Sequence, residues 1–194
     1  MDTQAAIGDA AVVQAIFDEA IALHRNLRDN LQPVIEAAAA IRSALAAGGK
    51  LLVFGNGGSA ADAQHVAAEL VGRFEREREG MAAIALTTDT SIATSLANDF
   101  TFDWVFARQV EALGRREDVA LGISTSGRSA NVLMAIQAAN ARGMKTIALT
   151  GRDGGTIGKA SAIHVNVPHA STARVQEVHR TLLHAMCALI ERTR

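Results

Sequence analysis

The stretch KLLVFGNGGSAADAQHVAAEL, residues 50–70, decides the fold of this chain. It begins with four apolar residues, Leu51 to Phe54, without polar alternation. A run this short and this apolar predicts a strand buried on both faces, as in a parallel sheet. Gly55 to Gly58 follow as a turn with few side-chain atoms. Ser59 then stands where it can cap a helix, with Asp62 three residues on, so the stretch predicts strand, tight loop and helix in succession.

The same stretch has features of a binding site. Backbone N–H groups converge where a glycine loop opens a helix, and such a loop can bind an anionic or polar ligand. On the predicted helix, His65 and Glu69 lie four residues apart and project from one face. Each feature alone also fits a plain turn or a solvated helix pair. Because the two occur together, we interpret the segment as part of a functional site.

The composition excludes several classes of protein. The 194 residues suffice for one α/β domain, which we expect to span 1–194. Lys plus Arg number 19 and Asp plus Glu 20, so nothing indicates nucleic-acid binding. No stretch suits a membrane span, and the first residues do not resemble a secretory signal. The single cysteine, Cys187, is expected to be a buried thiol, and we expect a cytoplasmic protein.

Two helices are expected ahead of the first strand. Apolar residues recur at three- and four-residue spacing over about 10–31, and again from Pro33 to 47. Neither helix belongs to a βαβ unit, so the apolar stripe from Val13 to Leu31 is expected to pack against a partner subunit. We therefore interpret 1–47 as oligomerisation helices, with His24 as an interface histidine.

Residues 48–194 are expected to form an α/β sandwich. Further strands are predicted at 82–86, 119–123, 145–149 and 163–167, and a last helix at 172–192. This alternation predicts a five-stranded, doubly wound parallel sheet of the flavodoxin-like order 2-1-3-4-5. The charge run from Glu75 to Glu79 is expected to be a solvated bend. Four aromatic residues, Phe100, Phe102, Trp104 and Phe106, are expected on a helix as core or interface residues.

A second loop of the ligand-binding type, Ser124 to Ser129, follows the third strand. Its hydroxyls and the N–H groups of the next helix can donate hydrogen bonds to phosphate oxygens. It lacks the GK[ST] signature, so it is not a nucleotide P-loop. In the order 2-1-3-4-5, strands 1 and 3 are neighbours at the switch point, where ligands bind. The sequence therefore predicts one pocket between the two loops.

A dinucleotide site is the competing interpretation of the first loop. Gly55, Gly57 and Ala60 satisfy the pattern G-x-G-x-x-A. That pattern expects an acidic residue about 20 positions further on, at the end of the second strand. The first acidic residue near that strand end is Asp89, well beyond this position. The hydroxyl-rich second loop also has no role in such a site.

The last predicted helix offers Gln176, His179 and His184. Gln176 and His184 are separated by about 80° around the helix axis and about 12 Å along it. Their separation makes direct binding of one small ion awkward. It requires the long Gln176 side chain to reach along the helix, or a local bend.

Four motifs, FGNGGSAADAQH, ALGISTSGRSANV, LTGRDGG and ARVQEVH, resemble those of the phosphoheptose isomerases within the sugar isomerase (SIS) superfamily. The resemblance covers the chain from about Gly48 onward. It implies a homotetramer with sites shared between subunits, and one zinc ion per subunit. The zinc ligands it implies are His65, Glu69, Gln176 and His184, with Glu69 and His184 as the catalytic acid/base pair. The substrate contacts it implies are Asn56, Gly57, Gly58, Ser59, Glu69, Asn98, Asp99, Ser124, Thr125, Ser126, Ser129 and Gln176.

Two positions depart from the family pattern. Arg128 stands where the family usually has asparagine, which is expected to add a cation beside the phosphate. Ala173 stands where some members have an acidic residue, so one sugar contact is in doubt.

The resemblance implies an isomerase that converts sedoheptulose 7-phosphate to D-glycero-D-manno-heptose 7-phosphate. The reaction passes through an enediol and is the first step towards bacterial ADP- or GDP-heptose. The alternative is a non-catalytic SIS paralogue that binds the replication initiator protein. A sugar-phosphate-sensing regulator would need a helix-turn-helix domain, for which the chain has no room. The presence of Glu69 and His184 favours the enzyme.

Overall fold

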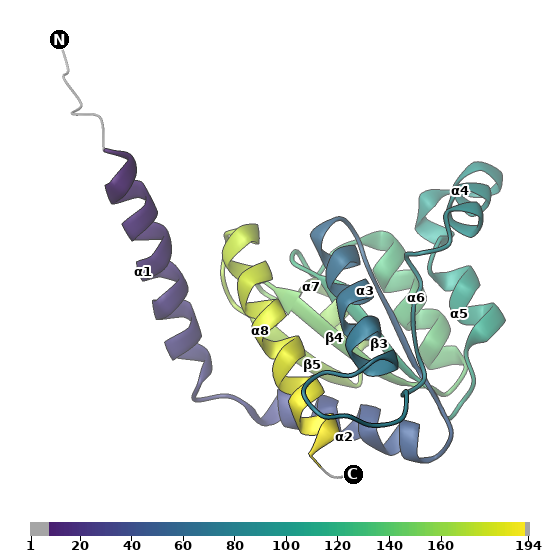
Figure 1. Ribbon diagram of the computed structural model, residues 1–194. Coiled ribbons are helices and arrows are strands. Elements are labelled where there is room, and N and C mark those ends of the chain that lie inside the picture. The colour runs from purple at the N-terminus through teal and green to yellow at the C-terminus, as the bar shows by residue number, and fades with distance from the viewer. Residues whose placement is uncertain (1–7, 193–194) are drawn as a thin grey trace.

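Five parallel strands form a single sheet in the order β2-β1-β3-β4-β5. The structure, a computed structural model, describes residues 8–192 (Figure 1). The predicted fold class and strand order are confirmed. The second strand is shorter than expected, three residues instead of five. The strands are β1 Leu51–Gly55, β2 Ala83–Ala85, β3 Val119–Ser124, β4 Lys145–Gly151 and β5 Ile163–Val167.

Helices precede the sheet and connect its strands. The two N-terminal helices are confirmed, although the first ends at Leu27, since the chain must turn before Pro33 enters the first turn of the second. A short helix after β4 was not expected from the sequence. The helices are α1 Asp9–Leu27, α2 Gln32–Ala46, α3 Gly58–Val71, α4 Thr90–Asp99, α5 Ala107–Leu113, α6 Ala130–Ala141, α7 Gly155–Ala160 and α8 Thr172–Glu191, with a 3-10 turn η1 at Phe102–Trp104.

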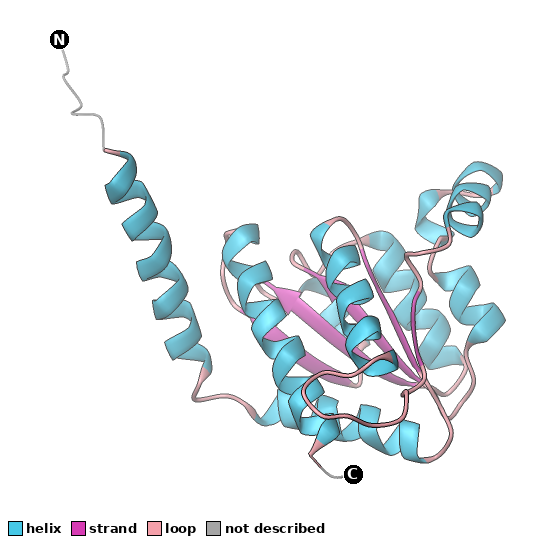
Figure 2. Ribbon diagram, viewed as in Figure 1, coloured by secondary structure: helices cyan, strands magenta, loops and turns pink. Residues whose placement is uncertain are grey.

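The sheet is buried on both faces between two layers of helices (Figure 2). Successive residues of β1 point to opposite faces. Leu51 and Val53 join the core formed with α2, α3 and α8. Leu52 and Phe54 join the core formed with α5, α6 and α7. This explains why the strand carries an unbroken apolar run: each face of the sheet has its own core.

Helix α1 extends away from the rest of the molecule (Figure 1). Leu23 is its one buried residue among those described. Its apolar side chains are largely exposed, Val13 at 51% and Phe17 at 63%. Contact with α8 includes a hydrogen bond of 3.0 Å between Nε2 of His24 and the hydroxyl of Thr181. Most of the predicted apolar stripe is therefore unpaired within one chain.

The aromatic cluster differs from the prediction. Only Phe106 is buried, and its ring stacks on Phe54 with centroids 5.5 Å apart. Phe100 and Phe102 are more than half exposed, and Trp104 is also exposed. Instead of one helix, η1 and α5 follow each other here. Phe106 is thus confirmed as a core residue. Phe100, Phe102 and Trp104 are not core residues, and their place at an interface stays a prediction.

Cys187 is a buried free thiol, as predicted. Burial, followed by the charges of Glu69 and Glu191, raises its pKa to about 12. Within residues 8–192, none of the helices combines the length and the hydropathy that crossing a membrane requires.

Candidate active site

The loop after β1 brings backbone N–H groups to the start of α3. Gly57 has φ of +55°, a conformation that side-chain-bearing residues rarely adopt. A Cβ at Gly58 would lie 2.4 Å from Nε2 of Gln176, so a larger residue there would displace the Gln176 side chain. The amide of Gln176, from α8, therefore lies against the first turn of α3. The contact between Gly58 and Gln176 therefore joins α3 to α8.

The predicted cap at Ser59 is wrong. Gly57 is the N-cap residue and makes no side-chain hydrogen bond, and Ser59 is already inside the first turn, buried at 3% exposure. The positive φ of Gly57 starts the helix earlier than the sequence pattern indicates. Asp62 is not part of a capping box and instead accepts a hydrogen bond of 2.8 Å from Nε of Arg180 on α8.

A pair of amides joins the loop after β1 to the first turn of α6, the helix that follows β3. Nδ2 of Asn56 donates to Oδ1 of Asn131 at 2.9 Å, and Nδ2 of Asn131 donates back to Oδ1 of Asn56 at 2.9 Å. Asn131 is buried in α6, with 3% exposure. The loop after β1 thus lies against the start of α6, and the pocket expected between the loops after β1 and β3 stays a prediction. Asn131 was missed in the sequence, although it lies within the ALGISTSGRSANV motif.

The loop after β3 gathers its hydroxyls at the N-terminus of α6. The hydroxyl of Ser124 lies 2.9 Å from that of Ser129 and 3.3 Å from that of Ser126. An anion at this point would meet hydroxyl donors and the positive end of a twelve-residue helix. The sequence predicts that Arg128 adds a cation beside the phosphate. In the structure, its guanidinium instead forms an ion pair with Asp153.

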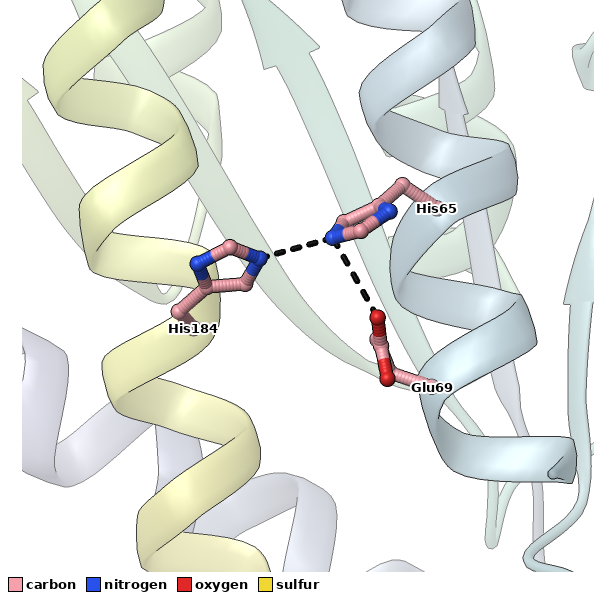
Figure 3. A group of neighbouring side chains, drawn as sticks. All are labelled: His65, Glu69 and His184. Atoms are coloured by element: carbon pink, nitrogen blue, oxygen red, sulfur yellow. Dashed lines mark hydrogen bonds and ion pairs between the residues drawn. The ribbon is translucent and has the colours of Figure 1, made fainter. Parts of the chain in front are cut away.

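Three side chains from α3 and α8 converge between the two helices (Figure 3). Nε2 of His65 lies 2.7 Å from Nε2 of His184, which is 119 residues away in the chain. The same atom lies 3.4 Å from Oε1 of Glu69. One nitrogen or oxygen from each of the three lies within 4.8 Å of the others, so the group can hold a metal ion. Two imidazole nitrogens and a carboxylate oxygen are ligands that suit Zn²⁺.

The surroundings favour a neutral His65. Burial lowers the pKa of His65, and the charge of Arg180 lowers it further, whereas the carboxylate of Glu69 acts in the opposite direction. A neutral imidazole has a free lone pair for a metal ion or a proton. The ion pair between Arg180 and Asp62 also joins α3 to α8 beside this group. Sequence reasoning missed Arg180 because nothing local indicates a partner 118 residues away.

Comparisons with known proteins agree with this arrangement. The SIS domain model matches residues 15–151. The phosphoheptose isomerase of Neisseria gonorrhoeae strain NCCP11945 is 54% identical over 183 residues, which cover 92% of this chain and 93% of that protein. The solved structure of phosphoheptose isomerase GmhA from Neisseria gonorrhoeae superposes with a TM-score of 0.87 at 50% identity, covering 92% of this chain and 96% of that one. A phosphoheptose isomerase structure from Francisella tularensis gives a TM-score of 0.92 at 38% identity, covering 96% and 100%.

The chain belongs to the phosphoheptose isomerase family. This confirms the resemblance carried by the four motifs. Because the relatives are isomerases by name, it also favours the enzyme over the non-catalytic paralogue and the dinucleotide-binding alternative.

Not all residues implied by the phosphoheptose isomerase pattern meet within one chain. Asn98 and Asp99 end α4, are exposed, and hydrogen-bond to each other. In Figure 1, α4 lies at the upper right above α5, and α3 and α6 are drawn between it and α8. Gln176 lies against Gly58, and makes no hydrogen bond to His65, Glu69 or His184 within the described part of the chain. His179 is fully buried with Nε2 at 2.9 Å from the carbonyl of Thr150, so it is a packing residue of α8.

Proposed function

We propose that this protein converts sedoheptulose 7-phosphate to D-glycero-D-manno-heptose 7-phosphate. The observation that carries the proposal is the convergence of His65, Glu69 and His184 in a chain whose family is the phosphoheptose isomerases. The product would enter bacterial heptose biosynthesis as its first intermediate. A cytoplasmic location belongs to the same proposal.

The phosphate of the substrate binds in the loop after β3. Ser124, Ser126 and Ser129 supply hydroxyl donors, and the N-terminus of α6 supplies N–H groups and a favourable dipole. The side chain of Thr125 and the residues of the first loop, Asn56 to Ser59, complete the predicted substrate contacts. The sugar chain then extends along α3 towards His65, about 10 Å from Gly58 along the helix.

Isomerisation moves a proton between C1 and C2 of the sugar through an enediol. Glu69 and His184 are the acid/base pair: one accepts the proton from carbon, and the other exchanges protons with the substrate oxygens. Both side chains are partly exposed beside each other, so a substrate can reach them. Their helices are joined by the Arg180–Asp62 ion pair, which maintains the spacing between the two groups.

A zinc ion in this site would be held by His65, Glu69 and His184, with Gln176 as the fourth ligand that the family resemblance implies. The donor set fits zinc, and burial favours the neutral form of His65 that metal binding needs. When bound, zinc supplies a Lewis acid that polarises the substrate oxygens.

The active enzyme is a homotetramer with sites shared between subunits. The exposed apolar side chains of α1 require a cover, and a second copy of the chain supplies one. Assembly also offers a route by which Asn98 and Asp99, distant from the site in one chain, reach the site of a neighbour.

The direct test is incubation with sedoheptulose 7-phosphate while aldose formation is followed by NMR. We expect turnover, and its loss after treatment with a chelator followed by recovery on adding zinc. Turnover that is unaffected by complete zinc removal would overturn the metal assignment. No turnover by the zinc-loaded tetramer would overturn the proposed activity.

A further inference from the structure

Residues 73–80 form an irregular segment between α3 and β2. The predicted solvated bend is confirmed for the exposed Glu75, Arg76, Glu77 and Glu79, but Arg78 is not exposed, and the segment is tied to the end of α8. Glu191, with 3% exposure, accepts hydrogen bonds from the backbone N–H groups of Phe74 and Glu75 at 3.0 Å, and of Arg76 at 3.1 Å. One buried carboxylate therefore orders three consecutive residues of an otherwise irregular segment.

Arg78 connects the same carboxylate to the C-terminus of α3. Its Nε donates to Oε1 of Glu191 at 2.9 Å, and its side chain is only 10% exposed. Its two other nitrogens donate to the carbonyls of Glu69 and Leu70, each at 2.8 Å, and of Gly72 at 3.3 Å. The last carbonyls of a helix have no partner within that helix. Arg78 satisfies those of Glu69 and Leu70, and in doing so it holds the backbone of Glu69.

Phe74 brings the segment against the other member of the acid/base pair. Its ring lies 5.4 Å from the ring of His184, centroid to centroid, with 34° between the planes. His184 also meets His65, with Nε2 atoms 2.7 Å apart. The His184 ring thus contacts one residue of α3 and one of the 73–80 segment, and the anchor for that segment is Glu191 on the helix of His184 itself.

We propose that Glu191 and Arg78 are positioning residues, which orient Glu69 and His184 by fixing residues 73–80 between α3 and α8. This inference rests on the proposed function, since it assumes that Glu69 and His184 carry the chemistry. The single ion pair acts on both members at once, on Glu69 through its backbone carbonyl and on His184 through the ring of Phe74. Neither positioning residue needs to contact the substrate.

The test compares Glu191→Gln with Asp118→Asn. Asp118 is a matched control because it too is a buried carboxylate that accepts backbone N–H groups and forms an ion pair, here with Lys50. It lies just before β3, and its hydrogen bonds go to Lys50 and Arg115 instead of residues 73–80. We expect Glu191→Gln to lower kcat per folded molecule about tenfold to a hundredfold with KM within about twofold, as for small displacements of catalytic groups. Asp118→Asn should lose stability only.

Phe74 gives a second test that leaves the ion pair intact. Phe74→Leu should lower kcat and shift the ring resonances of His184 in NMR spectra of ¹⁵N-histidine-labelled protein. Phe74→Tyr, which keeps an aromatic ring, should have the kcat and the His184 resonances of the parent. If Glu191→Gln does not fold, Phe74→Leu and Phe74→Tyr decide the matter alone. Unchanged His184 resonances and unchanged kcat in Phe74→Leu would overturn the inference.

The two proposals fail in different ways. If Glu69→Gln and His184→Gln keep full activity, the catalytic assignment falls. The response of the His184 resonances to Phe74→Leu would still report whether residues 73–80 position that ring.

Discussion

The Nε2 atoms of His65 and His184 face each other at 2.7 Å. Two imidazole nitrogens at hydrogen-bond distance can share one proton, and both cannot carry one. Burial lowers the pKa of His65, which favours the neutral form of that ring. The same nitrogens are available to a cation when neither is protonated. The residue pair is thus suited to exchange a proton or to hold a metal ion.

Glu69→Gln and His184→Gln should each lower kcat by about 10²–10⁴-fold, the usual contribution of a general acid or base. Neither side chain is fully buried, so we expect tetramer and melting temperature to be kept. Steady-state kinetics, calorimetry and the zinc content of each variant check this. A folded, zinc-loaded Glu69→Gln enzyme with full activity would contradict it.

Ser126→Ala and Ser129→Ala should raise KM with little change in kcat. Each removes a hydroxyl from the cluster around Ser124. A hydrogen bond to a charged group contributes about 1.5–3 kcal/mol, which corresponds to about tenfold or more in affinity. Ser161 is the control, because its hydroxyl donates a hydrogen bond to the carbonyl of Ile157. Ser161→Ala should leave KM unchanged. Normal KM in both loop variants would place the phosphate elsewhere.

At the scale of elements, α3 and α8 act as one unit. Three contacts join them along their length: Gln176 against Gly58, Arg180 with Asp62, and Glu191 with the segment that leaves α3. The site lies between the last two of these contacts. The spacing of His65 and His184 therefore depends on polar contacts on either side as well as on the apolar core beneath.

Low pH should weaken the third contact, between Glu191 and residues 74–78. Burial alone raises the pKa of Glu191, but the N–H groups of residues 74–76 and the Arg78 guanidinium outweigh it and lower the pKa to about 2. A carboxyl with a depressed pKa adds stability above its unfolded value of 4.5, and this is lost as pH falls towards 2. Urea unfolding between pH 5 and 2.5 should show a smaller loss for Glu191→Gln than for the parent. Equal losses would mean that Glu191 does not carry this dependence.

Much of the fold was predictable at this scale because it depends on local patterns. Unbroken apolar runs located the strands, and the glycine and serine loops located the switch point. The features that the sequence did not predict are contacts between segments far apart in the chain. Neither the hydrogen bonds from the backbone of residues 74–76 to Glu191 nor the Asn56–Asn131 pair leaves a local signal. The wrong cap at Ser59 has another cause, since the positive φ of Gly57 starts α3 early.

At the scale of the whole molecule, α1 is the feature that one chain does not explain. Phe17, Ile21 and Leu31 line a groove of about 570 Å³ between α1 and α8. Exposed apolar surface of this kind is typical of interaction sites. It agrees with the expectation that residues 1–47 serve oligomerisation, of which residues 1–7 lie outside the described part of the chain.

Phe17→Glu should therefore weaken assembly, because a charge would have to be buried in an apolar interface. Light scattering at micromolar concentration should show a tetramer for the parent and smaller species for the variant. Lys145→Glu, an exposed charge reversal at the start of β4, should remain tetrameric. A monomeric parent would contradict the prediction.

Helix α8 follows every strand of the sheet in the chain, yet it carries His184 and Glu191. During synthesis, N-terminal portions fold first, so the whole sheet and α3 emerge from the ribosome before the last helix does. At that stage His65 and Glu69 are present without His184, the third member of the group. A nascent chain cannot complete the metal-binding group until translation has passed His184, nor fix the segment after α3 until it has reached Glu191. The site can therefore bind a metal ion or substrate only after α8 has been synthesised.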